Sequence, residues 1–152
     1  MKVLGIRCSN SDYTFSVLDG TKTSPSLIDT RNLAYPQGFR LPKSLKWFLL
    51  EIDALLTNHS IERIVIKGFE GRTRGKAYEE RVEHEAMVFL AAENHGLKAV
   101  FRKVKGTIAK DLGLKGRGQY LSTSLDTSAI ANFDSYDDKT KESIWAAWSE
   151  LP

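Results

Sequence analysis

Cysteine is almost absent from this sequence. Cys8 is the single cysteine among 152 residues, which excludes an internal disulfide and is typical of proteins that work in a reducing compartment. We predict that Cys8 is a small buried hydrophobic residue beside the first strand rather than a reactive thiol.

Long hydrophobic runs are also missing. The apolar stretches Trp47–Leu50 and Ala86–Ala92 are far too short to span a bilayer, and no basic and apolar leader opens the chain. We therefore expect a cytoplasmic protein that does not contact a membrane. A length of 152 residues with 41% hydrophobic and 27% charged residues predicts one globular domain covering residues 1–152.

The charges are unevenly distributed, although the net charge is only +3. Residues 98–117 contain seven basic residues and one acidic residue, whereas residues 126–150 contain six acidic residues and two basic ones. A basic middle segment indicates a surface that faces a polyanion. For any single lysine, ordinary solvation is the simpler interpretation.

Hydrophobic patterning predicts five strands and four helices. Alternation and β-branched runs favour strands, whereas apolar residues at helical spacing favour helices. The strands are expected at 2–8, 13–20, within 26–33, at 61–66 and at 98–104, and the helices at 42–58, 77–94, 107–112 and 137–148.

The sequence also predicts which residues two of the helices bury and where the chain is irregular. The helix over 77–94 is expected to bury Tyr78, Val82, Ala86, Phe89 and Leu90, the closing helix to bury Ile144, Trp145 and Trp148, and residues 122–136 to be irregular. The main elements follow in the order β-β-β-α-β-α-β-α. Three strands joined by short turns and two later βα units predict one α/β domain with a mixed five-stranded sheet flanked by helices.

A glycine-flanked basic loop follows the fourth strand. Residues 67–76 read KGFEGRTRGK and lie where a buried strand ends, the edge at which open α/β sheets bind ligands. A second glycine-containing basic loop covers residues 113–118. The residues predicted to contact phosphate are Arg72, Arg74, Lys76, Lys105, Lys110, Lys115 and Arg117.

Aromatic residues beside these loops have two interpretations. Phe69 and Tyr120 could stack on unpaired bases, but packing within the protein is the favoured one. Glu80 and His84, four residues apart, could bind a metal, but ion pairs along an acidic helix are favoured.

The element order is that of the ribonuclease H-like fold, and several segments resemble RuvC-type Holliday-junction resolvases. These are Val3–Ile6, Ile64–Ile66 with the following loop and helix, Lys105–Gly118 and Glu142–Ala147. The whole sequence also resembles a family of uncharacterised bacterial proteins that carries the run Lys67–Glu85 nearly intact. These resemblances imply a ribonuclease H-like fold.

The sequence departs from the resolvases where they hold two divalent metals. Arg7 stands at the position of the first-strand aspartate and Lys67 at that of the fourth-strand glutamate; Glu142 matches one helical carboxylate, but Lys139 stands one turn earlier. Cations cannot coordinate Mg²⁺. The resemblance therefore implies a degenerate centre at Arg7, Lys67 and Glu142, in which both cations are expected to share Glu142, and no metal cofactor.

The leading hypothesis is a noncatalytic nucleic-acid-binding or nucleic-acid-associated protein. One alternative is a nuclease dependent on Mg²⁺ or Mn²⁺, with a relocated acidic set of Asp12, Glu70 and Glu142. The other is a protein-interaction module that uses the acidic tail and the loop at residues 35–40.

Overall fold

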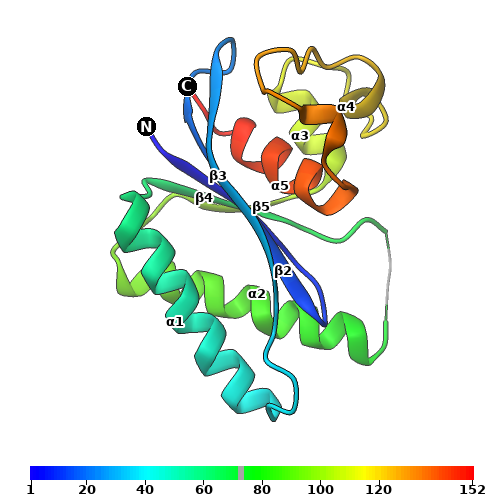
Figure 1. Ribbon diagram of the computed structural model, residues 1–152. Helices are drawn as coiled ribbons and strands as arrows, with labels where there is room; N and C mark the ends of the chain where they lie inside the picture. The colour runs from blue at the N-terminus through cyan, green and yellow to red at the C-terminus, as the bar shows by residue number, and fades with distance from the viewer. Residues whose placement is uncertain (72–73) are drawn as a thin grey trace.

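The computed structural model describes residues 1–71 and 74–152. Its centre is a mixed five-stranded sheet in the order β3-β2-β1-β4-β5, drawn in Figure 1. β1 pairs with β2 antiparallel and with β4 parallel, and β5 extends the parallel half. The strands are β1 (Val3–Cys8), β2 (Asp12–Gly20), β3 (Pro25–Ala34), β4 (Arg63–Lys67) and β5 (Val100–Lys103).

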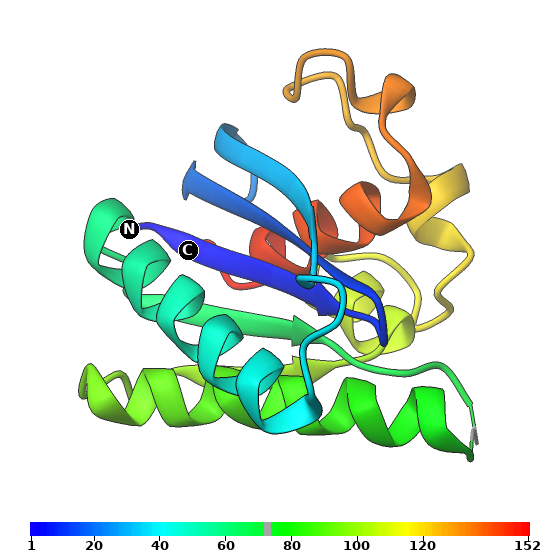
Figure 2. The ribbon, with the colours of Figure 1, turned by 60° about the horizontal axis from the view of Figure 1, so that its bottom comes forward.

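Helices cover both faces of this sheet (Figures 1 and 2). They are α1 (Leu41–His59), α2 (Lys76–Asn94), α3 (Lys105–Asp111), α4 (Tyr120–Thr123) and α5 (Asp138–Trp148), with a 3-10 turn at Phe133–Ser135. Within the described residues, no helix has the length and apolar character needed to cross a membrane.

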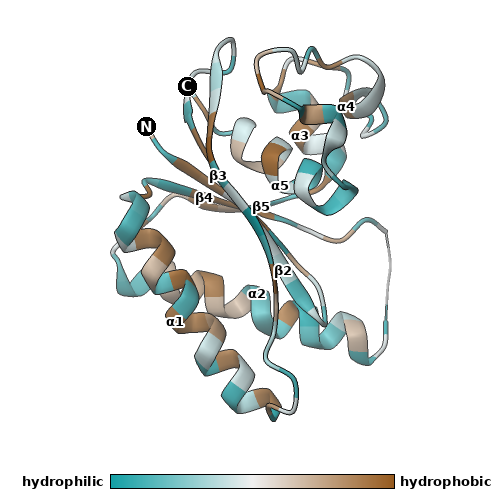
Figure 3. Ribbon diagram, viewed as in Figure 1, coloured by the Kyte–Doolittle hydropathy of each residue, from teal (hydrophilic) through white to brown (hydrophobic). Residues whose placement is uncertain are grey.

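Two hydrophobic clusters hold the layers together. Leu4 and Ile6 of β1 pack with Phe48 of α1 and Val88 of α2 on one face, whereas Val3 of the same strand packs with α5 on the other. Successive strand residues point to opposite faces of a sheet, so one buried strand supplies both cores. Along α1, hydrophobic and hydrophilic segments alternate in Figure 3, as expected of a helix with one face on the core.

Gly5 sets how closely α5 lies on β1. A Cβ atom at this position would be 1.9 Å from the Ser143 carbonyl oxygen and 2.6 Å from the Ala147 amide nitrogen. The two hydroxyls of Ser16 and Ser143 lie 2.6 Å apart and share a hydrogen bond in the same contact. The missing side chain therefore lets the backbone of α5 approach the centre of the sheet.

The predicted order of elements is confirmed, with boundary shifts of one or a few residues. Ile144, Trp145 and Trp148 of α5 are buried, and so is Cys8, as predicted. The prediction that residues 122–136 are irregular was wrong in part, since α4 ends inside this segment and the 3-10 turn lies within it.

The predicted inner face of α2 was wrong. Ala86, Phe89 and Leu90 are exposed, and the buried residues include the polar side chains of Arg81, His84 and Glu85. Those polar groups are buried because partners elsewhere in the fold satisfy them, which helical periodicity does not reveal.

Candidate functional site

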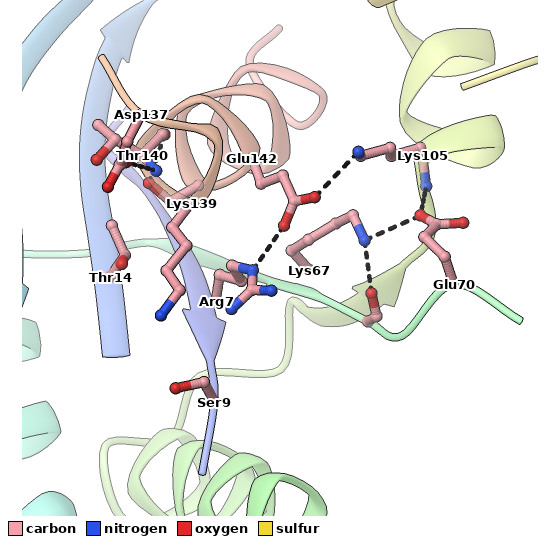
Figure 4. Close-up of polar contacts among 12 residues, drawn as sticks. Arg7, Ser9, Thr14, Lys67, Glu70, Lys105, Asp137, Lys139, Thr140 and Glu142 are labelled. Carbon is pink, nitrogen blue, oxygen red and sulfur yellow. Dashed lines mark hydrogen bonds and ion pairs between the residues drawn. The ribbon is translucent and has the colours of Figure 1, made fainter. Parts of the chain in front are cut away.

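The two cations at the expected centre are brought together by the parallel pairing of β1 and β4. Ile6 lies opposite Ile66 in the register, so the next residues, Arg7 and Lys67, emerge side by side where the two strands end. Figure 4 shows Arg7 pointing toward Glu142 in the first half of α5, whereas the Lys67 ammonium group points toward Glu70. We call Arg7, Lys67, Glu70, Lys105 and Glu142 the ionic centre.

Glu142 joins β1 to α3. Its carboxylate accepts a hydrogen bond from Arg7 Nε at 2.6 Å and pairs with Lys105 Nζ at 3.0 Å. The Glu142 side chain is only 12% exposed and that of Arg7 20%. The Arg7 Nη1 atom is buried and, within the described part of the chain, has no hydrogen-bond acceptor.

Lys67 has a different carboxylate partner. Its ammonium group lies 2.9 Å from Glu70 Oε1 and donates to the Gly68 carbonyl oxygen at 2.6 Å. The Glu70 carboxylate also accepts the backbone N–H of Lys105 at 2.6 Å. Glu142 acts on Lys67 only through its longer-range field, so the expectation that Arg7 and Lys67 directly share Glu142 fits Arg7 and not Lys67.

These contacts change how the centre titrates. Burial alone raises the pKa of Glu142, but the charges of Lys67, Lys105 and Arg7 outweigh it and hold this pKa below its usual value. Burial lowers the pKa of Lys67, against the opposing effect of Glu70. Each charge in this partly buried centre therefore favours the charged form of its oppositely charged neighbours.

A second ion pair lies beside the ionic centre. Lys139, in the first turn of α5, contacts both carboxylate oxygens of Asp12 at 2.8 Å. Asp12 also accepts a hydrogen bond from the Ser9 hydroxyl at 2.6 Å. Although burial opposes it, these contacts lower the pKa of Asp12.

The centre does not fit a divalent metal. The cations Arg7, Lys67 and Lys105 lie within it and Lys139 lies beside it. The carboxylates of Glu142, Glu70 and Asp12 are already paired with cations. Mg²⁺ and Mn²⁺ need oxygen ligands that are free to coordinate. Across residues 1–71 and 74–152, no group of three or more His, Cys, Asp or Glu side chains is arranged to hold a metal. Asp12, Glu70 and Glu142 pair instead with Lys139, Lys67 and Arg7.

The predicted phosphate-contacting residues divide into three groups. Arg72 lies outside the described residues, and Lys105 is held in the ionic centre by Glu142. The others are exposed and lie on the loop after β4, at the start of α2 and from α3 onward, near the end of the sheet where β4 and β5 finish (Figure 2). We call them the basic rim: Arg74, Lys76, Lys110, Lys115 and Arg117.

Phe69 packs within the protein. Its ring lies 5.0 Å from that of Tyr78 and carries the Arg81 guanidinium at 4.1 Å. Both ring nitrogens of His84 have hydrogen-bond partners, since Nδ1 lies 2.6 Å from the Glu80 backbone oxygen and Nε2 lies 3.2 Å from Ser44 Oγ. Tyr120 lies at the start of α4, where it is half-buried.

A buried network of hydrogen bonds and ion pairs next to the ionic centre was not predicted from the sequence. Arg81 donates to the Lys67 carbonyl oxygen at 2.6 Å and to Glu85 at 3.1 Å, and Arg102 donates to Glu85 at 2.8 Å. The spacing of Arg81 and Glu85 is an ion-pair signal on a helix. Nothing local indicates that this pair is buried against the end of β4.

Comparison with solved structures identifies the fold. The chain is similar to RuvC of Thermus thermophilus in complex with Holliday junction substrate, with a TM-score of 0.76 and 11% identity over 98% of this chain and 91% of that one. It is also similar to the yeast mitochondrial Holliday junction resolvase, with a TM-score of 0.62 and 13% identity over 97% and 77% of the two chains.

A third similar structure is fowlpox virus resolvase with Holliday junction DNA, with a TM-score of 0.54 and 9% identity over 98% and 97% of the chains. No family model and no curated protein sequence matches the chain. The chain therefore has a ribonuclease H-like fold of the RuvC type, as predicted from the order of its elements. At these identities the likeness establishes the fold alone.

Proposed function

We propose that this protein binds nucleic acid through the phosphate backbone and does not cleave it. The observation that carries the proposal is the charge of the centre. Arg7 and Lys67 lie at the edge of the sheet, and Lys139 lies in the first turn of α5. Each pairs with a carboxylate that a metal would otherwise need. A metal-dependent nuclease uses such ions to activate water and to stabilise the leaving oxygen, and this arrangement provides no ligands for them.

The basic rim supports binding. Its five residues are exposed, and Lys76 makes only a long contact of 3.7 Å with Glu80 while remaining 89% exposed. Exposed cations gathered near one end of a sheet neutralise phosphates and release counterions, which produces binding with little sequence preference. The similar structures that contain Holliday junctions make branched DNA the first ligand to test.

The test is a salt series measured by fluorescence anisotropy with a labelled four-way junction and a labelled single strand. The protein should bind both at low salt, and its affinity should fall steeply as salt rises. In the triple variant Arg74→Ala, Lys115→Ala, Arg117→Ala, the slope of log affinity against log salt should decrease by about 2 to 3.

A matched control removes three exposed cations from other elements. Arg31→Ala, Lys46→Ala, Lys98→Ala changes the net charge equally but leaves the basic rim intact. Equal slopes for the two triple variants, or no binding of the unmodified protein at low salt, would refute binding through the rim.

A further inference from the structure

Asp12, which pairs with Lys139 beside the ionic centre, also lines an open cavity of about 380 Å³. The turn between β1 and β2, the segment between β3 and α1, and residues of α1 and α2 line it. Ser44 and His84 line this cavity together with Pro36, Phe39 and Leu41. It therefore combines apolar walls with a hydroxyl and an imidazole.

Hydrogen bonds settle the roles of the two polar groups. His84 Nδ1 lies 2.6 Å from the Glu80 backbone oxygen, and His84 Nε2 lies 3.2 Å from Ser44 Oγ. A carbonyl oxygen only accepts, so Nδ1 carries the proton and Nε2 of the neutral ring is the acceptor. The Ser44 hydroxyl must then donate to His84 Nε2.

The imidazole ring is held firmly in this orientation. It stacks on the Tyr35 ring at 4.1 Å with an interplanar angle of 13°, and the Tyr35 hydroxyl donates to the Ser9 carbonyl oxygen at 3.2 Å. His84 is 2% exposed and Ser44 7%. Burial lowers the pKa of His84, against the effects of Glu80 and Glu83, which favours the neutral ring.

A serine hydroxyl that donates to a histidine, with the histidine oriented by a third group, is the arrangement of an activated nucleophile. Here the third group is a backbone carbonyl. We propose that Ser44 is a nucleophile and His84 its general base in the hydrolysis of uncharged carboxylic esters bound in this cavity.

The reaction balances with water as the only co-substrate. Ser44 Oγ attacks the ester carbonyl carbon while its proton passes to His84 Nε2, and the carbon–oxygen bond to the alcohol breaks as that proton moves to the leaving oxygen. Water then attacks the acyl-Ser44 ester, again with His84 taking and returning the proton. Pro42 has no amide N–H and the Ser44 amide donates to the Arg40 carbonyl oxygen, so the amides of Leu41 and Lys43 are the nearest donors along the chain for the developing oxyanion.

The lining selects the class of ester. Phe39 and Leu41 provide apolar contact for the acyl group, whereas the carboxylates of Asp12 and Glu80 border the same space. These carboxylates disfavour an anionic substrate. A small, uncharged ester is therefore the matching probe.

The experiment uses p-nitrophenyl acetate and a fluorophosphonate label on the full chain. The unmodified protein should release a burst of p-nitrophenolate equal to the protein concentration, and mass spectrometry should place the phosphonyl group on Ser44. Ser44→Ala should lose both, and Ser122→Ala, at an exposed serine outside the cavity, should keep both.

A second variant tests His84 as the general base while the fold is monitored. His84→Phe keeps an aromatic ring on Tyr35 and should lower the acylation rate about 100-fold or more, with a circular dichroism spectrum like that of the unmodified protein. The acylation rate should rise with pH as His84 deprotonates and level off before neutral pH, because burial holds the pKa of His84 below its ordinary value. The groups that face it are Glu80 and Glu83 of α2, with Tyr35 and Asp12 across the cavity.

Absence of the burst in the folded protein, labelling at another residue, or equal rates for the unmodified protein and Ser44→Ala would each overturn the proposal. Ser44→Cys guards against a folding artefact in the alanine variant. It should still form an acyl adduct, and failure to do so while folded would also count against Ser44.

Discussion

Replacing Glu142 by glutamine is the sharpest perturbation of the ionic centre. The substitution keeps the shape of the side chain and removes the charge that Arg7 and Lys105 contact at 2.6 and 3.0 Å. It also removes the field that supports the buried charge of Lys67. Within the ionic centre, Glu70 is then the one carboxylate left to balance Arg7, Lys67 and Lys105.

The expected loss of stability follows from burial. Removing one partner of a buried ion pair costs about 3 to 5 kcal/mol. Because Arg7 and Lys105 are 20% and 34% exposed and keep some solvation, we expect the lower end, about 3 kcal/mol. For a chain of this length each kcal/mol lowers the melting temperature by about 2 to 4 °C, so the Glu142→Gln variant should melt about 6 to 12 °C lower.

Urea unfolding followed by circular dichroism measures this loss, with Arg31→Gln as the control. Arg31 pairs with Asp29 at 3.2 Å but is 65% exposed, so its loss should cost less than about 1 kcal/mol. The double variant Arg7→Gln, Glu142→Gln should be more stable than the sum of the single changes predicts, since Arg7 is no longer a charge left without its carboxylate. A Glu142→Gln effect no larger than that of Arg31→Gln would refute the argument that the centre is a coupled network.

Two further predictions concern pH and packing. The lowered pKa values of His84 and of Asp12, Glu70 and Glu142 mean that the unfolded chain binds protons more readily. The free energy of unfolding should therefore decrease as pH falls below about 6.5, and again below about 4, which urea midpoints across pH will test; a flat profile would contradict it. Gly5→Ala should lower the free energy of unfolding by more than about 3 kcal/mol, because its Cβ would meet the backbone of α5. Gly116→Ala, with open space around its Cβ, should change the urea midpoint little. Similar urea midpoints for the two variants would show that α5 does not pack closely on β1 at Gly5.

The fold was predictable because its determinants are local. The β-branched runs, the amphipathic stripe of α1 and the turn signals mark the elements, and short connections restrict how the strands pair. A glycine inside an apolar strand, such as Gly5 in β1, often marks close approach of another backbone, and the structure places α5 there.

The inner face of α2 could not be predicted in this way. Arg81, His84 and Glu85 are polar, so periodicity assigns them to solvent, yet the Lys67 carbonyl, Ser44 and Arg102 satisfy them in the interior. Phe89 and Leu90 remain exposed. Burial of a polar side chain depends on partners that are distant in sequence.

The candidate centre was predictable only in part. The parallel register that places Arg7 beside Lys67 follows from the fold, and Glu142 follows from the resemblance of α5 to the final resolvase helix. The role of Lys105, which donates its backbone N–H to Glu70 and contacts Glu142 with its side chain, depends on how the chain turns after β5. No residue pattern encodes that turn.

The most direct test of the central claim is one incubation in which binding and cleavage are read together. A labelled four-way junction is mixed at low salt with carefully purified protein and with Mg²⁺ or Mn²⁺, and the products are resolved on native and denaturing gels. We expect a shifted complex on the native gel and full-length strands on the denaturing gel. Cleavage that disappears in Glu142→Ala or Glu70→Ala would contradict the account, because these carboxylates would then serve a metal rather than the ion pairs of the centre.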